Sequence, residues 1–203
     1  MDKKKESICS TNIDRSIKMP AASEVLANDF TEIISALSEN DRLRNSVVQL
    51  ISNEPAPGKV TEGTGRLDKL RGILIDLVNS QINFTEAYER TQLELARELS
   101  PYSSNNKVFA QNWYRRLIDT QLSRFYNQAV MEQLIAEGET ECFVPHSSAE
   151  ASDSKCSMHL AGSNHDLQML YTRLVDSYSK GKWTQELKIP HHPNCTHVVT
   201  YAQ

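Results

Sequence analysis

The most informative stretch of the sequence is Ile189-Pro190-His191-His192-Pro193-Asn194-Cys195-Thr196-His197. It holds three histidines and one cysteine within seven residues. A second group of the same chemistry, Cys156-Ser157-Met158-His159, lies upstream. A tetrahedral zinc site takes four nitrogen or sulfur ligands, usually as two close pairs on two turns. The spacing therefore predicts a zinc site with these ligands: Cys156, His159, His192 and Cys195.

Three other histidines, His191, His197 and His165, are candidate replacements for one of these ligands. The alternative interpretation is that the histidines are solvated in polar loops and that the small cysteines are buried without a metal. The two pairs lie further apart than in standard finger patterns, and an expected helix fills the interval. Because four ligands close a tetrahedral coordination sphere, a structural zinc is predicted rather than a catalytic one.

Composition limits the class of protein. The chain has 203 residues, 39% of them hydrophobic, and a net charge of −4. Its mean hydropathy of −0.50 predicts a soluble protein, and its acidic pI near 5.9 argues against a protein that coats nucleic acid. No apolar run approaches the roughly 20 residues of a membrane helix, and no apolar stretch follows the basic N-terminus. Without a secretory signal we expect a reducing cytoplasm, with the four cysteines as thiols or metal ligands instead of two disulfides.

Apolar residues recur every three or four positions over much of the chain, which predicts helices. Asn83 with Glu86 has the spacing of a capping box. The longest expected helix runs over residues 107–137 and ends at Gly138. Four parts follow from these patterns: a flexible N-terminal tail (1–20), an N-terminal helical arm and loop (21–65), a helical body (66–138) and a small Cys/His-rich α+β lobe (139–203).

The pattern changes after Gly138. Residues 141–145 and 197–201 are short, β-prone and bounded by turn residues, so we expect two paired strands of a small antiparallel sheet. Asp166 is placed to cap a helix that runs to about residue 180. Pairing of the two strands would bring the two Cys/His groups together. The predicted fold is mainly α: a helical body with one long helix and a small C-terminal α+β lobe.

Three arginines, Arg115, Arg116 and Arg124, interrupt the apolar face of the longest helix. The simpler interpretation is the solvated face of an amphipathic helix. The alternative is contact with phosphate or with a partner protein.

The C-terminal half resembles a known family. Residues Thr120-Gln121-Leu122-Ser123-Arg124-Phe125-Tyr126-Asn127-Gln128-Ala129 are similar to the helix that opens the C-terminal domain of phage minor head proteins of the phage Mu F type. The order that follows is also similar: a Gly-ended helix, a short strand, Cys156-Ser157-Met158-His159-Leu160-Ala161-Gly162, and Pro190-His191-His192-Pro193-Asn194-Cys195-Thr196-His197-Val198-Val199. The resemblance covers about residues 115–201.

The chain departs from the family pattern in four respects. Its first pair is Cys-x2-His instead of Cys-x2-Cys, Thr196 replaces an arginine, an extra helix precedes His191, and the chain is short. The resemblance implies a low-copy virion component near the portal, acting in head morphogenesis or in DNA packaging and ejection. It implies portal or major capsid protein as partners, contact with DNA, assembly in the host cytoplasm, and no enzymatic activity.

Two other functions fit the residues without the resemblance. A cytoplasmic adaptor or regulatory protein, built as a helical bundle and stapled by zinc, would need the same ligands. A metal-dependent hydrolase would need an open coordination position and a general base, for which Glu150, Asp153 and Asp166 are the candidates. None of these carboxylates has the spacing of a known hydrolase motif, so we predict that the protein is not an enzyme.

Overall fold

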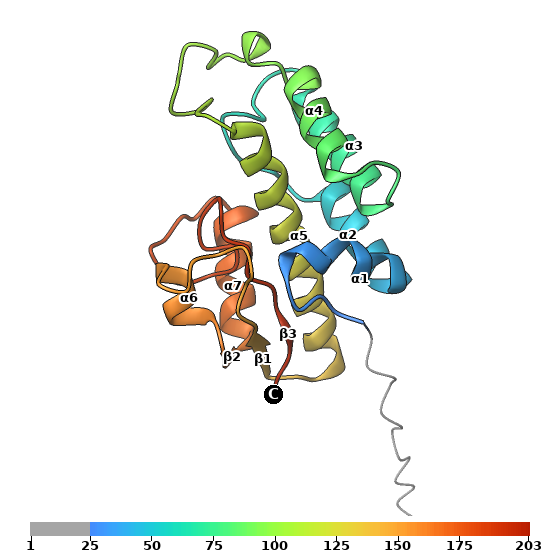
Figure 1. Cartoon of the computed structure of the whole chain (residues 1–203), viewed down its shortest axis with the longest axis vertical. Helices are drawn as coiled ribbons and strands as arrows, with labels where there is room; N and C mark the ends of the chain where they lie inside the picture. Colours follow the sequence, from blue (N-terminus) through green and yellow to red (C-terminus); the bar gives the residue numbers. More distant parts are fainter. Residues whose placement is uncertain (1–24) are drawn as a thin grey trace, which may run out of the picture.

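Figure 1 shows the computed structural model of the chain, which describes residues 25–203. The predicted tail (1–20) lies outside the described residues. The described part is mainly helical with a small antiparallel sheet near its C-terminus, so the predicted fold class is confirmed. No helix within residues 25–203 combines the length and the apolar character needed to cross a membrane.

In chain order the elements are η1 (Phe30–Glu32), α1 (Ile33–Glu39), α2 (Asp41–Asn53), α3 (Arg66–Val78), α4 (Phe84–Glu94), η2 (Arg97–Leu99), α5 (Trp113–Glu137), β1 (Glu141–Val144), α6 (Lys155–Leu160), β2 (Ser163–Asp166), α7 (Leu167–Tyr178) and β3 (Thr200–Tyr201).

Helix α5 is the centre of the molecule (Figure 1). It is 25 residues long, and every residue from Thr120 to Met131 is buried. Helices α2 and α4 pack on it from the N-terminal part of the chain, and α7 packs on it from the C-terminal part. A helix that is buried all round must be enclosed by neighbours, and these three supply them. The long helix therefore joins the two parts of the fold.

The expected start of this helix at residue 107 was wrong, because α5 begins at Trp113. The Asn105 side chain accepts the backbone N–H groups of Lys107 and Val108 (2.9 and 3.2 Å), and such local bonds compete with a helix. Asn112 then takes a left-handed conformation with φ of 58°. The expected end is confirmed, since Gly138 has φ of 92° and caps the helix.

Two other helix starts follow the local signals in the sequence. The Asn83 side chain accepts the Glu86 N–H at 3.0 Å, and the Glu86 carboxylate accepts the Asn83 N–H at 2.8 Å. This is the predicted capping box, and it opens α4. The Asp166 carboxylate accepts the Met169 N–H at 2.6 Å and opens α7. Both caps are thus confirmed.

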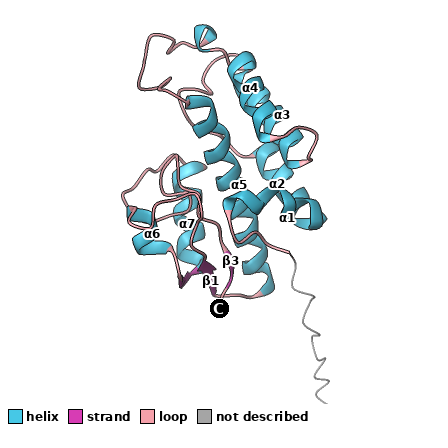
Figure 2. Ribbon diagram, in the orientation of Figure 1, coloured by secondary structure: helices cyan, strands magenta, loops and turns pink. Residues whose placement is uncertain are grey.

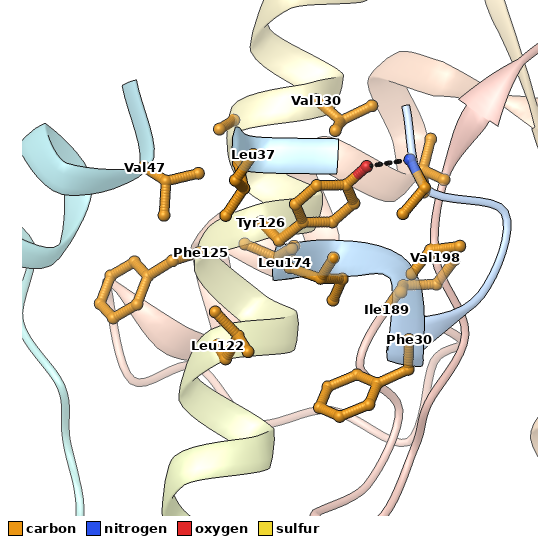
Figure 3. Close-up of a cluster of buried hydrophobic side chains, with 14 of the residues drawn as sticks. Phe30, Leu37, Val47, Leu122, Phe125, Tyr126, Val130, Leu174, Ile189 and Val198 are labelled. Atoms are coloured by element: carbon orange, nitrogen blue, oxygen red, sulfur yellow. Dashed lines mark hydrogen bonds between the residues drawn. The ribbon is translucent and has the colours of Figure 1, made fainter. Parts of the chain in front are cut away.

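The apolar core is one connected cluster that includes residues from Ala27 to Val199. Figure 3 shows its middle, where α5 side chains meet Leu37 and Val47 on one side and Leu174 and Val198 on the other. The buried Tyr126 hydroxyl accepts a hydrogen bond from the Ala27 N–H at 2.7 Å (Figure 3). The segment before η1 is thereby tied to the central helix.

The sheet has the strand order β2-β1-β3 with antiparallel pairs. The predicted pairing of the first and last strands is confirmed, with Cys142 opposite Tyr201 and Phe143 opposite Thr200. The last strand is shorter than expected and starts at Thr200. Strand β2 was not predicted, because residues 163–166 are polar and mostly exposed and show no alternating pattern.

A row of buried polar side chains on α5 binds the backbone of irregular segments. Thr120 Oγ1 donates to the Pro193 carbonyl at 2.7 Å, and Arg124 Nη1 donates to the Pro55 carbonyl at 2.6 Å. Asn127 Nδ2 donates to the His197 carbonyl at 3.2 Å, while its Oδ1 accepts the Val199 N–H at 2.8 Å. These helix positions are four and three residues apart and therefore share one face. Residues 193–199 are held on the helix in this way.

We predict that Asn127→Leu lowers the free energy of unfolding by about 3 kcal/mol, because two buried backbone groups lose their partners. Gln128→Leu is the matched control. The Gln128 side chain is also buried, but its Oε1 has no hydrogen-bond partner within residues 25–203, and its Nε2 donates only to the half-buried Glu132 carboxylate at 3.1 Å. The change leaves no backbone group unpaired and should cost less than about 1 kcal/mol. Urea denaturation of both variants measures the difference. Equal losses in the two variants would contradict the role given to Asn127.

Candidate metal centre

Four side chains of the C-terminal lobe place ligand atoms within 4.8 Å of one another: Glu150, Cys156, Cys195 and His197. Cys156 lies on α6, and the other three lie in loops, which Figure 2 shows as long irregular segments beside α6 and α7. Cys156 and His197 are fully buried, Cys195 is 3% exposed, and the Glu150 side chain is 6% exposed. The group therefore forms a closed site that could hold a metal ion.

The distances suit a small tetrahedral ion. Bond lengths of about 2.3 Å to sulfur and about 2.0 Å to nitrogen put tetrahedral ligand atoms about 3.3–3.8 Å apart. Cys195 Sγ lies 3.5 Å from His197 Nδ1, and His197 Nδ1 lies 3.6 Å from the Glu150 Oε2. Cys156 Sγ is 2.8 Å from Glu150 Oε1. A shared ion would need only small movements of these side chains.

Cys156 and His159, the first pair of predicted ligands, both lie on α6, and only Cys156 reaches the site. The Ser154 side chain caps the helix by accepting the Ser157 N–H, and Cys156 then faces inward. His159 was predicted as a ligand, but it is exposed and is not part of the cluster. The prediction assumed an irregular turn over residues 156–159. In a helix His159 instead lies about 4.5 Å further along the axis than Cys156, and here it points to solvent.

The second pair lies on a tight turn, as expected. The Cys195 N–H donates to the His192 carbonyl at 2.9 Å, and Pro193 occupies the turn position that proline favours. Cys195 reaches the cluster, whereas His192 lies at its edge with a side chain that is 36% exposed. His192 Nε2 is 3.1 Å from both Cys156 Sγ and Glu150 Oε1. His192 is therefore an outer partner of the site.

His197 was predicted only as a replacement ligand, and it is a full member of the cluster. Its Nε2 lies 3.3 Å from the buried Ser157 hydroxyl, which leaves Nδ1 directed at Cys195 and Glu150. A bond to the second ring nitrogen is the usual way in which a protein orients a metal-binding histidine. Ser157 follows Cys156 in the chain, so α6 supplies both a candidate ligand and this support.

Glu150 was not predicted as a ligand. It is one of two carboxylates, with Asp153, in the polar loop before Cys156, and it was considered only as a general base. Burial opposes its ionisation, but hydrogen bonds from the Cys156 thiol and the Thr196 N–H outweigh burial and hold the pKa of Glu150 below its usual value. The Cys195 thiol donates to the Cys156 sulfur, which lowers the pKa of Cys156 to about 6. A buried carboxylate beside a thiol that loses its proton readily is a donor set for a divalent cation, which would take the place of the proton between Cys156 and Glu150.

The two other predicted replacement ligands lie outside the cluster. His165 is on β2, and its Nε2 contacts the Leu160 carbonyl at 2.8 Å. His191 has a buried Nδ1 without a hydrogen-bond partner among the described residues. Burial and the nearby Lys188 lower the pKa of His191.

The three arginines predicted to contact a partner or phosphate have different surroundings. Arg115 is exposed and lies over the Tyr88 ring, with 5.0 Å from its guanidinium carbon to the ring centroid. Arg116 is half-buried and donates to the Gln111 carbonyl at 2.8 Å. For Arg124 both interpretations are corrected, because the side chain is fully buried and pairs with Glu54 at 3.5 Å. Burial lowers its pKa to about 10.

No protein-family model, curated protein or solved structure matches the chain. The chemistry of the site is therefore argued from its own residues. Two cysteine sulfurs, one imidazole nitrogen and one carboxylate oxygen are a donor set that zinc accepts. Such an ion would bridge the loop before α6, helix α6 itself and the C-terminal loop.

We predict that His197→Ala lowers zinc affinity by more than the roughly 100-fold that loss of an outer partner costs, because a ligand is removed. His192→Ala should lower it by about 10- to 100-fold, as expected for an outer partner. His159→Ala is the control, because His159 is exposed and should leave affinity unchanged. Competition titration with a chromogenic chelator measures all three. A loss in His159→Ala that matches the loss in His197→Ala would contradict this ligand set.

Proposed function

We propose that the protein is a zinc-stapled assembly protein of a phage head, a low-copy component that contacts the portal or the major capsid protein. One observation carries the proposal. Cys156 and Cys195 lie in the two stretches that resemble the phage family, and they meet in one buried cluster. The stretches that resemble the family are thus the same stretches that build the candidate metal centre.

The burial of the cluster supports a structural metal over a catalytic one. A catalytic zinc keeps an open position for water or substrate, next to a general base. Here Cys156, Cys195 and His197 are at most 3% exposed. The only carboxylate of the cluster, Glu150, is itself in ligand position. A metal in this place would hold loops together and would not reach a substrate.

The place of the cluster also supports a stapling role. The segments that carry it have little regular secondary structure of their own (Figure 2). The loop before α6, residues 145–154, has no buried apolar residue with which to offset the entropy of ordering it. A metal that binds only the folded form would add its binding free energy to folding. The lobe would then present a fixed surface to a partner protein.

We predict about one zinc per chain in protein purified without chelator, measured by elemental mass spectrometry. Removal of the metal should lower the melting temperature by about 10 °C, because several kcal/mol of binding free energy are lost. Cys195→Ala should lack the metal and melt at the lower temperature with or without chelator. Wild-type protein that is free of metal, and whose melting temperature chelator leaves unchanged, would exclude the staple.

The assembly role needs a separate test. We expect the gene to lie beside genes for a portal protein and a terminase, and we expect the protein to co-assemble with that portal when both are expressed together. Electron microscopy of the purified portal complex should then show added density in few copies. A zinc-bound protein that binds neither portal nor major capsid protein would refute the head role and favour a zinc-stapled adaptor.

A further inference from the structure

A groove of about 750 Å³ lies beside the first turns of α5. Its walls come from the loops before α3 and α5, from α5 itself, from the start of α6 and from the segment between α7 and the metal cluster. In Figure 1 the loop before α5 is lime, the upper turns of α5 follow it, and the segment after α7 is red. The volume is in the range of small-molecule binding sites. The groove is distinct from the buried cluster, although His192 touches both.

The charge of the groove is opposite to that of the chain. The protein has 26 acidic residues and a net charge of −4, yet none of the residues that line the groove is acidic. Among the described residues, no carboxylate lies within ion-pair distance of any of its four basic side chains. Unpaired cations around one cavity favour an anionic ligand. These side chains, called the groove cations below, are Lys107, Arg116, Lys155 and Lys188.

Lys188 is the most informative of the groove cations. The residue is only 3% exposed, and a buried lysine is normally paired with a carboxylate. Its ammonium group has three donors, and one of them binds the Thr184 carbonyl at 3.0 Å. Burial lowers its pKa, although Glu186 nearby opposes the shift. Glu186 itself pairs with Arg173. An anion in the groove would supply the missing counter-charge.

Both tryptophans of the chain line the same groove. Trp183 is 58% exposed, which is unusual for so large an apolar side chain. Its ring is held edge-on against Tyr178, with centroids 4.9 Å apart. Trp113 is held edge-on by Phe109 at 5.0 Å. A fixed and largely exposed indole ring such as Trp183 is a platform on which a flat aromatic base stacks.

We propose that this groove is a nucleotide-binding site, in which the groove cations hold phosphate and the Trp183 ring stacks on the base. A nucleotide joins the two chemistries that the groove offers, a multiply charged anion and a flat ring. The source is a free nucleotide or one unit of a single strand, because bases in a duplex are already stacked on one another. The acidic net charge agrees with a local site and not with a coat on nucleic acid. The inference does not depend on the proposed role in a phage head.

The test is a titration of the full-length, metal-loaded protein with adenosine 5′-triphosphate at low salt. Because both tryptophans lie in the groove, their intrinsic fluorescence reports on the groove alone. We expect quenching by the nucleotide. Inorganic tripolyphosphate carries only the charge and should bind at least about fivefold more weakly, since stacking contributes about 1–3 kcal/mol per base. Adenosine carries only the base and should also bind at least about fivefold more weakly, because it lacks the phosphate charge. Tripolyphosphate that binds as tightly as the nucleotide would overturn the proposal.

Two matched variants locate the ligand. Arg116→Ala should weaken nucleotide binding severalfold, whereas Arg115→Ala, its exposed neighbour outside the groove, should not. Trp183→Ala should weaken binding at least about fivefold, with an unchanged circular dichroism spectrum because the side chain is largely exposed. Unchanged affinity in both Arg116→Ala and Trp183→Ala would place the ligand elsewhere and overturn the proposal.

A single strand is distinguished from a free nucleotide by a second titration with an oligothymidylate of about ten nucleotides. Tighter binding of the strand than of thymidine monophosphate, lost in Trp183→Ala, would identify a strand as the source. Equal affinities would identify a free nucleotide at the same site. The zinc content is measured on the same samples, so a failed titration on metal-loaded protein counts against the groove and leaves the assembly role untouched.

Discussion

The buried polar row on α5 is the constraint on which the rest of the structure depends. Thr120, Arg124 and Asn127 each bind backbone groups of segments that have no helix or strand of their own. Such groups cannot be buried without partners, because each unpaired one costs about 1–3 kcal/mol. The helix supplies these partners, so two irregular segments can pack against the core. The candidate metal centre takes Cys195 and His197 from a segment that this row holds, and the groove takes Pro193 from the same segment.

The same row explains why the metal cluster is closed. Asn127 binds the carbonyl of His197 and the N–H of Val199, which fixes the backbone on either side of Val198. With that backbone in place, the His197 ring is buried against Ser157 of α6. The cluster is therefore positioned by a helix that contributes no ligand to it. A metal ion bound by the cluster would add a second link between the C-terminal loop, which α5 already holds, and helix α6.

Local signals in the sequence predicted the features that depend on neighbouring residues. The capping box at Asn83 and the end of α5 at Gly138 were found in this way. The pairing of β1 with β3 joins distant residues, and it was predicted because both segments are β-prone. Side-chain contacts between distant residues were missed. Arg124 looked like a surface residue because arginine usually is one, yet Pro55 and Glu54 bind it in the core. Nothing in the sequence marked Glu150 as a metal ligand, because its place in the cluster comes from folding and not from spacing.

The metal cluster and the groove share a wall, and this relates the two proposals physically. Lys155 lines the groove and precedes Cys156 in α6, while His192 lines the groove and lies 3.1 Å from the Cys156 sulfur. An ion that fixed Cys156 and Cys195 would also fix the backbone beside these two groove residues. Side chains held in place before a ligand arrives lose less entropy when it binds. A metal bound in the cluster would thus favour ligand binding in the groove by fixing the positions of Lys155 and His192.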